Sequence, residues 1–202
     1  MVNSVIIKSI CVYCGSADNL PSVYLDAAVE MGRLLARNGY RLVYGAGKTG
    51  MMGALADSVL TNGGEVVGIT PENLNTPQLI HANLTRLEVV GDIHIRKARM
   101  SALADAFIAL PGGFGTLDEL FETLTWAQIR LHTKPIGILN TNHYYEPLVN
   151  MVNKAHLEGF IYSEHEQLYV IDEDPADLLQ KLINFCNPEG LDRWVQRDSP
   201  DL

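Results

Sequence analysis

The chain has 202 residues, with 15 Lys and Arg against 24 Asp and Glu, which gives a formal net charge of −9 at pH 7. This length fits one domain, and a hydrophobic fraction of 47% supplies enough apolar side chains for one core. The acidic balance argues against a nucleic-acid partner, because binding to phosphate backbones needs clustered Lys and Arg.

The N-terminal residues lack the charged start, apolar core and cleavage site of a signal peptide. No apolar run approaches the roughly 20 residues that span a bilayer. The three cysteines, Cys11, Cys14 and Cys186, form no disulfide framework. We therefore expect a cytoplasmic protein with reduced thiols and no membrane partner.

Apolar β-branched runs alternate with helix-like segments along the chain. In order, the pattern predicts a strand at 4–13, a helix at 21–37, a strand at 41–44, a helix at 49–60, a strand at 65–70, an irregular segment at 71–83, a strand at 86–90, a helix at 93–104, a strand at 106–110, a helix at 116–129, a strand at 135–139, a helix at 145–158, a strand at 168–171 and a helix at 175–185. This alternation predicts a parallel sheet covered by helices, in a Rossmann-like, doubly wound α/β fold. We assign one domain to residues 1–186 and a polar tail to residues 187–202.

Ligands of such folds bind at the carboxyl ends of the strands. Three loops rich in small residues are expected there, at 14–17, 45–47 and 111–116. Backbone approaches a phosphate closely only where side chains are absent, so converging small-residue loops favour a nucleotide or a sugar phosphate as ligand.

The loop at residues 45–50 matches the dinucleotide pattern G-x-G-x-x-G. It follows the second predicted strand rather than the first, and no acidic residue ends the next strand. Its Gly47-Lys48-Thr49 also resembles a P-loop, but Leu42 stands where that motif needs glycine. We favour a tight strand-to-helix turn that lines the pocket, with a dinucleotide-dependent oxidoreductase as an alternative.

The loop at residues 111–116 reads Pro-Gly-Gly-Phe-Gly-Thr, follows an apolar strand and precedes a helix. Consecutive backbone N–H groups at a helix start bind anions, aided by the helix dipole. A glycine-rich turn without a ligand is the alternative. The sequence favours a phosphate site here.

Glu119 has two interpretations. Thr116 and Glu119 match the capping box S/T-x-x-E, in which the glutamate bonds the backbone of the cap. Alternatively, Asp118, Glu119 and Glu122 place acid beside an anion site, an arrangement that chemistry would justify. The residues alone leave both interpretations open.

Arg96 and Lys97 lie near the start of a predicted helix and could bind a phosphate or a carboxylate, although a solvated basic face is the usual meaning of such a run. Cys11 and Cys14 are spaced C-x-x-C without a second pair, which favours core thiols over a metal or redox site. The six histidines lack metal-ligand spacing. We expect no metal and no cofactor.

The combination of Arg96-Lys97-x-x-Met100 with Pro111-Gly112-Gly113-x-Gly115-Thr116-x-x-Glu119 resembles the LOG ("Lonely Guy") family of cytokinin riboside 5′-monophosphate phosphoribohydrolases. The resemblance extends from the segment at 11–16 to Gly159-Phe160-Ile161. It implies a Rossmann-like homodimer with active sites near the interface.

The resemblance also implies a small-molecule nucleotide, AMP or an N6-modified AMP, as the substrate, and a free base and ribose 5-phosphate as products. It implies catalytic roles for Arg96 and Glu119. Substrate contacts are implied at Gln78, Arg96, Lys97, Gly112, Gly113, Phe114, Gly115, Thr116, Leu117, Asp118, Glu119 and Thr125. Gln78 replaces a glutamate that the family carries, so it can hydrogen-bond a substrate without charge.

The expected mechanism follows glycoside hydrolysis, through an oxocarbenium-like state. Glu119 would stabilise that charge and activate water, while Arg96 orients Glu119, and the N–H groups of residues 113–116 would hold the 5′-phosphate. The alternative is a carrier or sensor that binds a nucleotide on the same loop without turnover.

Overall fold

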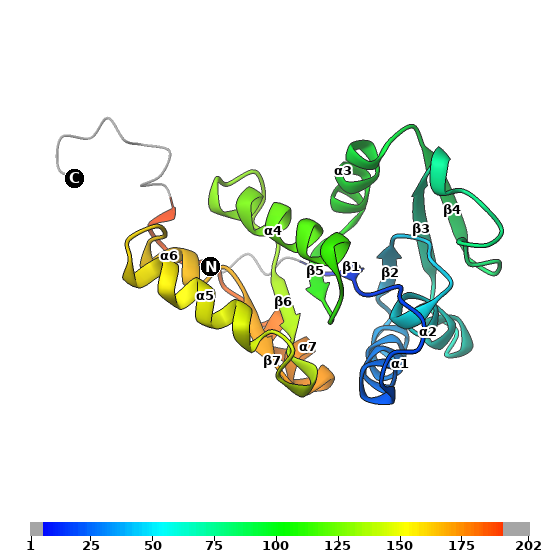
Figure 1. Ribbon diagram of the computed structural model, residues 1–202, viewed down its shortest axis with the longest axis horizontal. Coiled ribbons are helices and arrows are strands. Elements are labelled where there is room, and N and C mark those ends of the chain that lie inside the picture. Colours follow the sequence, from blue (N-terminus) through cyan, green and yellow to red (C-terminus); the bar gives the residue numbers. More distant parts are fainter. Residues whose placement is uncertain (1–5, 192–202) are drawn as a thin grey trace.

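The structure, a computed structural model, describes residues 6–191 (Figure 1). Seven parallel strands form one sheet in the order β4-β3-β2-β1-β5-β6-β7. The strands are β1 Ser9–Tyr13, β2 Arg41–Tyr44, β3 Val66–Pro71, β4 Arg86–Val90, β5 Ala106–Ala109, β6 Ile136–Leu139 and β7 Val170–Asp172. The predicted doubly wound α/β fold is confirmed.

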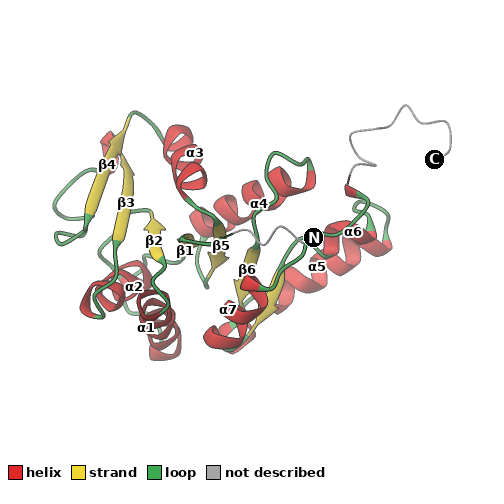
Figure 2. Cartoon of the chain, turned by 180° about the vertical axis from the view of Figure 1, so that it is seen from behind, coloured by secondary structure: helices red, strands yellow, loops and turns green. Residues whose placement is uncertain are grey.

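Helices cover both faces of the sheet (Figure 2). They are α1 Ser22–Arg37, α2 Gly50–Thr61, α3 Ile93–Leu103, α4 Phe114–Gln128, α5 Glu146–Leu157, α6 Ser163–Glu166 and α7 Pro175–Ile183, with short 3-10 turns η1 Glu72–Leu74 and η2 Thr141–His143. One core cluster joins α1, α2 and α7 to the sheet, and the other joins α3 and α4 to its opposite face. The residues of β1 from Ile10 to Tyr13 contribute to the two clusters in turn, which explains why the strand is apolar on both faces after Ser9.

Most predicted boundaries differ from the structure by one or two residues, and the start of the first strand differs by more. The first strand begins at Ser9 rather than at residue 4, and residues 1–5 lie outside the described part. The helix predicted from residue 116 begins at Phe114, since Gly113 has extended backbone and is the N-cap, and Gly115 lies within the first turn. The short elements η1, η2 and α6 were not predicted, since three or four residues show no periodicity.

The predicted tail begins within the described part of the chain. Asn187 Nδ2 donates to the Thr133 carbonyl at 2.8 Å, and Leu191 is buried in the core cluster that contains α3 and α4. Folded structure therefore extends to Leu191, and residues 192–202 lie outside the described part.

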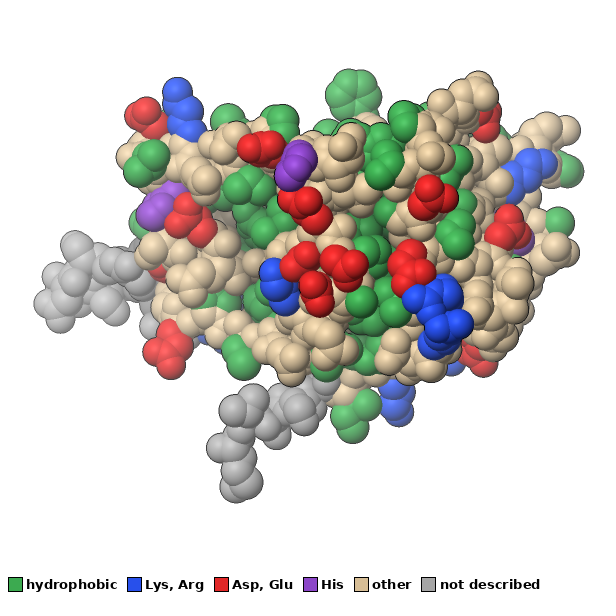
Figure 3. Space-filling model, turned by 90° about the horizontal axis from the view of Figure 1, so that it is seen from below, with side chains coloured by type: hydrophobic (Ala, Val, Ile, Leu, Met, Phe, Trp, Pro, Cys, Tyr) green, Lys and Arg blue, Asp and Glu red, His purple; other side chains and the backbone are tan. Residues whose placement is uncertain are grey.

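The surface agrees with the acidic composition. On the face in Figure 3, acidic side chains gather in groups and basic side chains are dispersed among them, so this face carries no continuous basic area. Among the described residues, no helix has both the length and the apolar character needed to cross a membrane.

The order of the strands fixes where a ligand binds. The chain passes from β1 through α1 and α2 to β4 at one edge, and then returns through α3 to place β5 on the other side of β1. The chain therefore leaves β1 and β5 toward opposite faces of the sheet, and the crevice between these two connections is where doubly wound folds bind ligands.

Candidate active site

A cavity of about 610 Å³ opens at this crevice. Its walls come from the carboxyl ends of β1, β2, β3, β5 and β6 and the loops that follow them, including Gly15, Gly45, Thr70, Gly112 and Tyr144. Small-molecule sites commonly measure roughly 300–1,000 Å³. The three predicted small-residue loops thus meet in one pocket of suitable size.

The glycine loop forms the start of α4, and residues 112–116 line the pocket. Gly113 is the N-cap, Leu117 N donates to the Gly113 carbonyl at 3.0 Å, and no side chain caps the helix. The first N–H groups of a helix have no acceptor within it. With the helix dipole, these N–H groups make the loop suited to an anion such as a phosphate.

The capping-box interpretation of Glu119 is wrong. Because Gly113 is the cap, Thr116 already lies inside the first turn of α4 and Glu119 lies one turn further along. The Glu119 carboxylate instead forms an ion pair with Arg96, with 3.1 Å between Oε1 and Nη1. Glu119 also lines the pocket, so its side chain is available for chemistry.

Arg96 projects from the first turn of α3, which Asp92 caps by accepting from His94 N and Ile95 N at 2.8 Å. Its Nε donates to the Ile69 carbonyl of β3 at 3.0 Å. Its guanidinium occupies the space that a side chain at Gly45 would need. Gly45 is therefore required for the position of Arg96, and Arg96 in turn holds Glu119.

Burial dominates the electrostatics of this pair. The side chains of Arg96 and Glu119 are 13% and 11% exposed. Burial raises the pKa of Glu119 to about 7, and the positive charge of Arg96 opposes this rise. Among the neighbouring charges, Asp118 and Glu122 raise the pKa of Glu119 further and Lys97 lowers it. A carboxyl that titrates near neutral pH can accept a proton during a reaction and release it afterwards.

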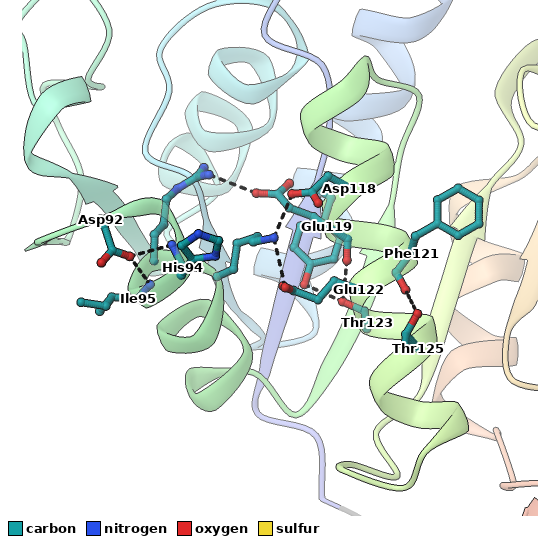
Figure 4. A network of polar contacts seen from close by, with 12 residues as sticks. Asp92, His94, Ile95, Asp118, Glu119, Phe121, Glu122, Thr123 and Thr125 are labelled. Atoms are coloured by element: carbon teal, nitrogen blue, oxygen red, sulfur yellow. Dashed lines mark hydrogen bonds and ion pairs between the residues drawn. The ribbon is translucent and has the colours of Figure 1, made fainter. Parts of the chain in front are cut away.

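Lys97 belongs to a second layer of ion pairs between α3 and α4. Its Nζ lies 3.0 Å from both Asp118 Oδ2 and Glu122 Oε1. Burial opposes the charge on Lys97, but hydrogen bonds to these two carboxylates raise its pKa overall. Figure 4 shows the carboxylates of Asp118, Glu119 and Glu122 on the side of α4 that faces α3.

The structure brings some of the predicted site residues into the pocket and leaves others outside. Arg96, Glu119 and the residues 112–116 line it. The others do not line it within one chain; they are Gln78, Lys97, Leu117, Asp118 and Thr125. Gln78 and Thr125 are exposed, and the Thr125 hydroxyl bonds back to the Phe121 carbonyl at 2.7 Å.

The loop at residues 45–50 is a strand-to-helix turn that lines the pocket, as predicted. A segment from the irregular region after β3 is fixed to it. Lys48 N donates to the Leu79 carbonyl at 3.0 Å, His81 N donates to the Ala46 carbonyl at 2.9 Å, and His81 Nε2 lies 3.0 Å from Asp57 Oδ1. The turn thus holds an apolar part of the pocket wall, with Leu74, Leu79 and Ile80 among its lining residues.

Sequence reasoning missed three tyrosines of the pocket: Tyr13, Tyr24 and Tyr144. Tyr13 ends β1 and Tyr144 follows β6, so their places after strands gave a signal. Tyr24 gave none, because it lies on a helix among other apolar residues. Cys11 and Cys14 are free and buried, as predicted, and burial raises the pKa of both thiols. Within residues 6–191 no cluster of three or more His, Cys, Asp or Glu side chains could hold a metal ion.

The sheet order and the pocket define a Rossmann-like protein with a small-molecule cavity at its switch point, and the uncapped start of α4 lines that cavity. A sequence profile described as "Possible lysine decarboxylase" matches residues 52–182. The rice cytokinin riboside 5′-monophosphate phosphoribohydrolase LOG is 42% identical over 201 residues, covering 96% of this chain and 83% of that protein. The enzyme of that name from Rhodococcoides fascians is 46% identical over 168 residues, covering 83% of this chain and 85% of its own. The chain belongs to the LOG family of phosphoribohydrolases.

Solved structures confirm the fold. The molybdenum cofactor binding protein of Rippkaea orientalis superposes with a TM-score of 0.65 at 21% identity, covering 88% of this chain and 96% of that chain. The molybdenum cofactor carrier protein of Chlamydomonas reinhardtii gives the same TM-score at 18% identity, with 89% and 99% covered. At these identities the likeness is one of fold alone. No lysine lines the described pocket, so the site gives no support to the decarboxylase description.

Proposed function

We propose that the protein hydrolyses the N-glycosidic bond of an N6-substituted adenosine 5′-monophosphate and releases the free base and ribose 5-phosphate. The observation that carries the proposal is the buried Arg96–Glu119 pair in the same pocket as the uncapped start of α4. The relatives named above as cytokinin riboside 5′-monophosphate phosphoribohydrolases support the choice of reaction.

In this mechanism the 5′-phosphate binds the N–H groups of residues 113–116 and anchors the ribose. The bond between ribose C1′ and the base nitrogen breaks, and its electron pair leaves with the base. Positive charge develops on the ribose, and the Glu119 carboxylate stabilises it. Water adds its oxygen to C1′ and gives a proton to Glu119, and Glu119 passes that proton to the departing base, which restores the carboxylate and leaves neutral base and ribose 5-phosphate.

Arg96 has two functions in this proposal. Its guanidinium stays protonated at neutral pH, so it acts through charge and hydrogen bonds rather than by proton transfer. It lowers the pKa of Glu119 against the effect of burial, which keeps a carboxylate population at neutral pH. It also fixes the orientation of Glu119 at 3.1 Å.

The lining of the pocket supports an N6 substituent. Leu74, Leu79, Ile80 and Met52 supply apolar area beyond what a phosphate and a ribose would use. Burial of each added methylene contributes about 0.8 kcal/mol. An isoprenoid-substituted AMP would therefore bind more tightly than AMP.

The test is to incubate the protein with AMP and with N6-isopentenyl-AMP and to separate the products by chromatography. We expect free base from the wild type, more from the N6-substituted nucleotide, and none from Glu119→Gln. Binding without product would instead favour the carrier on the same fold. Measurable NAD(P) affinity would favour an oxidoreductase that uses residues 45–50.

We also propose that the protein is a homodimer through α4. Phe114 is 94% exposed and Phe121 is 47% exposed, and Figure 4 shows Phe121 on the side of α4 away from the ion pairs. Thr125 lies one turn beyond Phe121, so its predicted substrate contact would be made across the interface. Light scattering should give a dimer for the wild type and a monomer for Phe121→Asp; a monomeric wild type overturns the proposal.

We place the protein in a reducing, cytoplasmic compartment, which the free thiols of Cys11, Cys14 and Cys186 support. Thiols blocked in denaturant at the moment of cell lysis and then counted by mass spectrometry should all carry the blocking label. A disulfide in the isolated protein would contradict this assignment.

A further inference from the structure

Three consecutive carbonyl groups precede α4, and each accepts a hydrogen bond from a different donor. The Leu110 carbonyl accepts from the Tyr145 hydroxyl at 2.7 Å, and the Pro111 carbonyl accepts from Gly15 N at 3.0 Å. The Gly112 carbonyl accepts from the Tyr144 hydroxyl at 2.6 Å. The backbone that leads into the proposed phosphate site is therefore held at every peptide.

A fixed carbonyl also fixes an N–H group. The peptide unit is planar and trans, so its C=O and its N–H point in opposite directions. The carbonyl of Gly112 shares a peptide unit with the N–H of Gly113, the first residue of the uncapped helix start. Glycines on both sides of this unit would otherwise let it rotate at little cost.

Tyr144 is itself held firmly. It follows β6 in a turn where Asn142 and His143 have φ of 52° and 57°, a region that costs about 1 kcal/mol or more for residues other than glycine. The Asn140 side chain accepts from Tyr145 N at 2.7 Å. The Tyr144 ring packs edge-on against Tyr145 and Tyr24, with centroids 5.1 and 6.0 Å apart. A strained turn thus presents one hydroxyl to one carbonyl of the glycine loop.

We propose that Tyr144 is a positioning residue for the substrate phosphate: its hydroxyl fixes the Gly112–Gly113 peptide so that the Gly113 N–H is oriented for the anion before the substrate arrives. The proposal rests on the proposed function, because it needs a phosphate at the start of α4. It predicts that the effect of Tyr144 is confined to ligands that carry the phosphate.

The chain supplies a matched control in Tyr145. Its hydroxyl makes an equally short bond to the Leu110 carbonyl, but that peptide unit ends in Pro111, which has no N–H to orient. Tyr145→Phe should therefore lower stability, since it leaves a buried carbonyl without its donor, and should leave phosphate affinity unchanged. Tyr144→Phe keeps the ring packing and removes only the hydroxyl.

Calorimetry with ribose 5-phosphate and with free N6-isopentenyladenine tests the proposal without requiring turnover. For Tyr144→Phe we expect about fivefold to tenfold weaker binding of ribose 5-phosphate, the loss of about one hydrogen bond, with base affinity unchanged. For Tyr145→Phe we expect both affinities to match the wild type.

Three outcomes would overturn the proposal, and they are distinguishable. If the wild type binds ribose 5-phosphate and Tyr144→Phe binds it equally well, Tyr144 positions nothing and the proposed function stands. If Tyr144→Phe weakens ribose 5-phosphate and base alike, or Tyr145→Phe weakens ribose 5-phosphate as much, the tyrosines act on general rigidity. If the wild type binds no ribose 5-phosphate, the phosphate site of the proposed function is wrong as well.

Discussion

Replacing Glu119 by glutamine should abolish base release and also make the protein more stable above neutral pH. Glutamine keeps the size of the side chain and can still accept a hydrogen bond from Arg96. It removes a negative charge whose burial raises the pKa of the carboxyl to about 7 from an ordinary value of 4.5. The wild type therefore carries a carboxylate that folding disfavours.

The size of the effect follows from proton linkage. Between these two pKa values the folded state binds more protons than the unfolded state, so the free energy of unfolding falls as the pH rises. For a pKa of about 7 against 4.5, the loss between pH 5 and pH 8 is about 2.5 kcal/mol. For a chain of this length, that corresponds to roughly 5–10 °C in Tm.

The assay is thermal unfolding of wild type and Glu119→Gln at pH 5 and pH 8. We expect the difference in Tm, variant minus wild type, to be larger at pH 8 than at pH 5 by roughly 5–10 °C. Glu158→Gln, which alters an exposed glutamate, serves as the control and should show no such increase. A difference in Tm that stays constant with pH would refute the reasoning, because Glu119 would then have no raised pKa in the folded protein.

Three further predictions concern the same framework. The value of kcat/KM should fall on the acid side of about pH 7, where Glu119 becomes protonated. Lys97→Met should move the midpoint of this fall to higher pH, because it removes a positive charge that lowers the pKa of Glu119. A pH–rate profile unchanged by the substitution would contradict this role of Lys97. Gly45→Ala should displace Arg96 and reduce kcat about 100-fold in steady-state kinetics. The Tm measured by calorimetry should stay within a few degrees of the wild type. An unaltered kcat would show that the reaction tolerates the displacement of Arg96. Asp105→Ala should lower the free energy of unfolding by about 1–2 kcal/mol at pH 7 in urea titrations, because one carboxylate oxygen accepts three hydrogen bonds from Lys8 and Ser9.

The size of the Asp105 effect also depends on pH. Burial opposes the charge, but the hydrogen bonds from Lys8 and Ser9 lower the pKa of Asp105 overall. A lowered pKa gives stability that is present above the ordinary value of 3.8 and is lost as the pH falls through the folded-state value. The difference between wild type and Asp105→Ala should therefore shrink in acid, and a difference that grows below pH 4 would be inconsistent with this role.

The sequence was sufficient for the sheet and for the glycine loop. Residues 106–110 could only be a buried parallel strand, because they are apolar on both faces and end in a run of glycines before a helix. The glycines before a helix start predicted an anion site, and the structure confirms the loop and the uncapped helix start on which that prediction depends. Arg96 and Glu119 could be paired only through their resemblance to a family, since 22 residues separate them along the chain.

Only the tertiary structure decided which side chain Glu119 contacts. The spacing of Thr116 and Glu119 is the same whether Glu119 belongs to a capping box or to an ion pair. The two interpretations differ in where α4 begins, and it begins at Phe114 rather than at Thr116. That boundary depends on glycine, whose backbone preferences are too weak to read locally. The ion pair between Glu119 and Arg96 depends on the return of the chain through α3. The space for the Arg96 guanidinium depends on Gly45, in the loop that follows β2. Sequence patterns describe contacts between near neighbours, whereas this site is made by four segments that meet only after the sheet has formed.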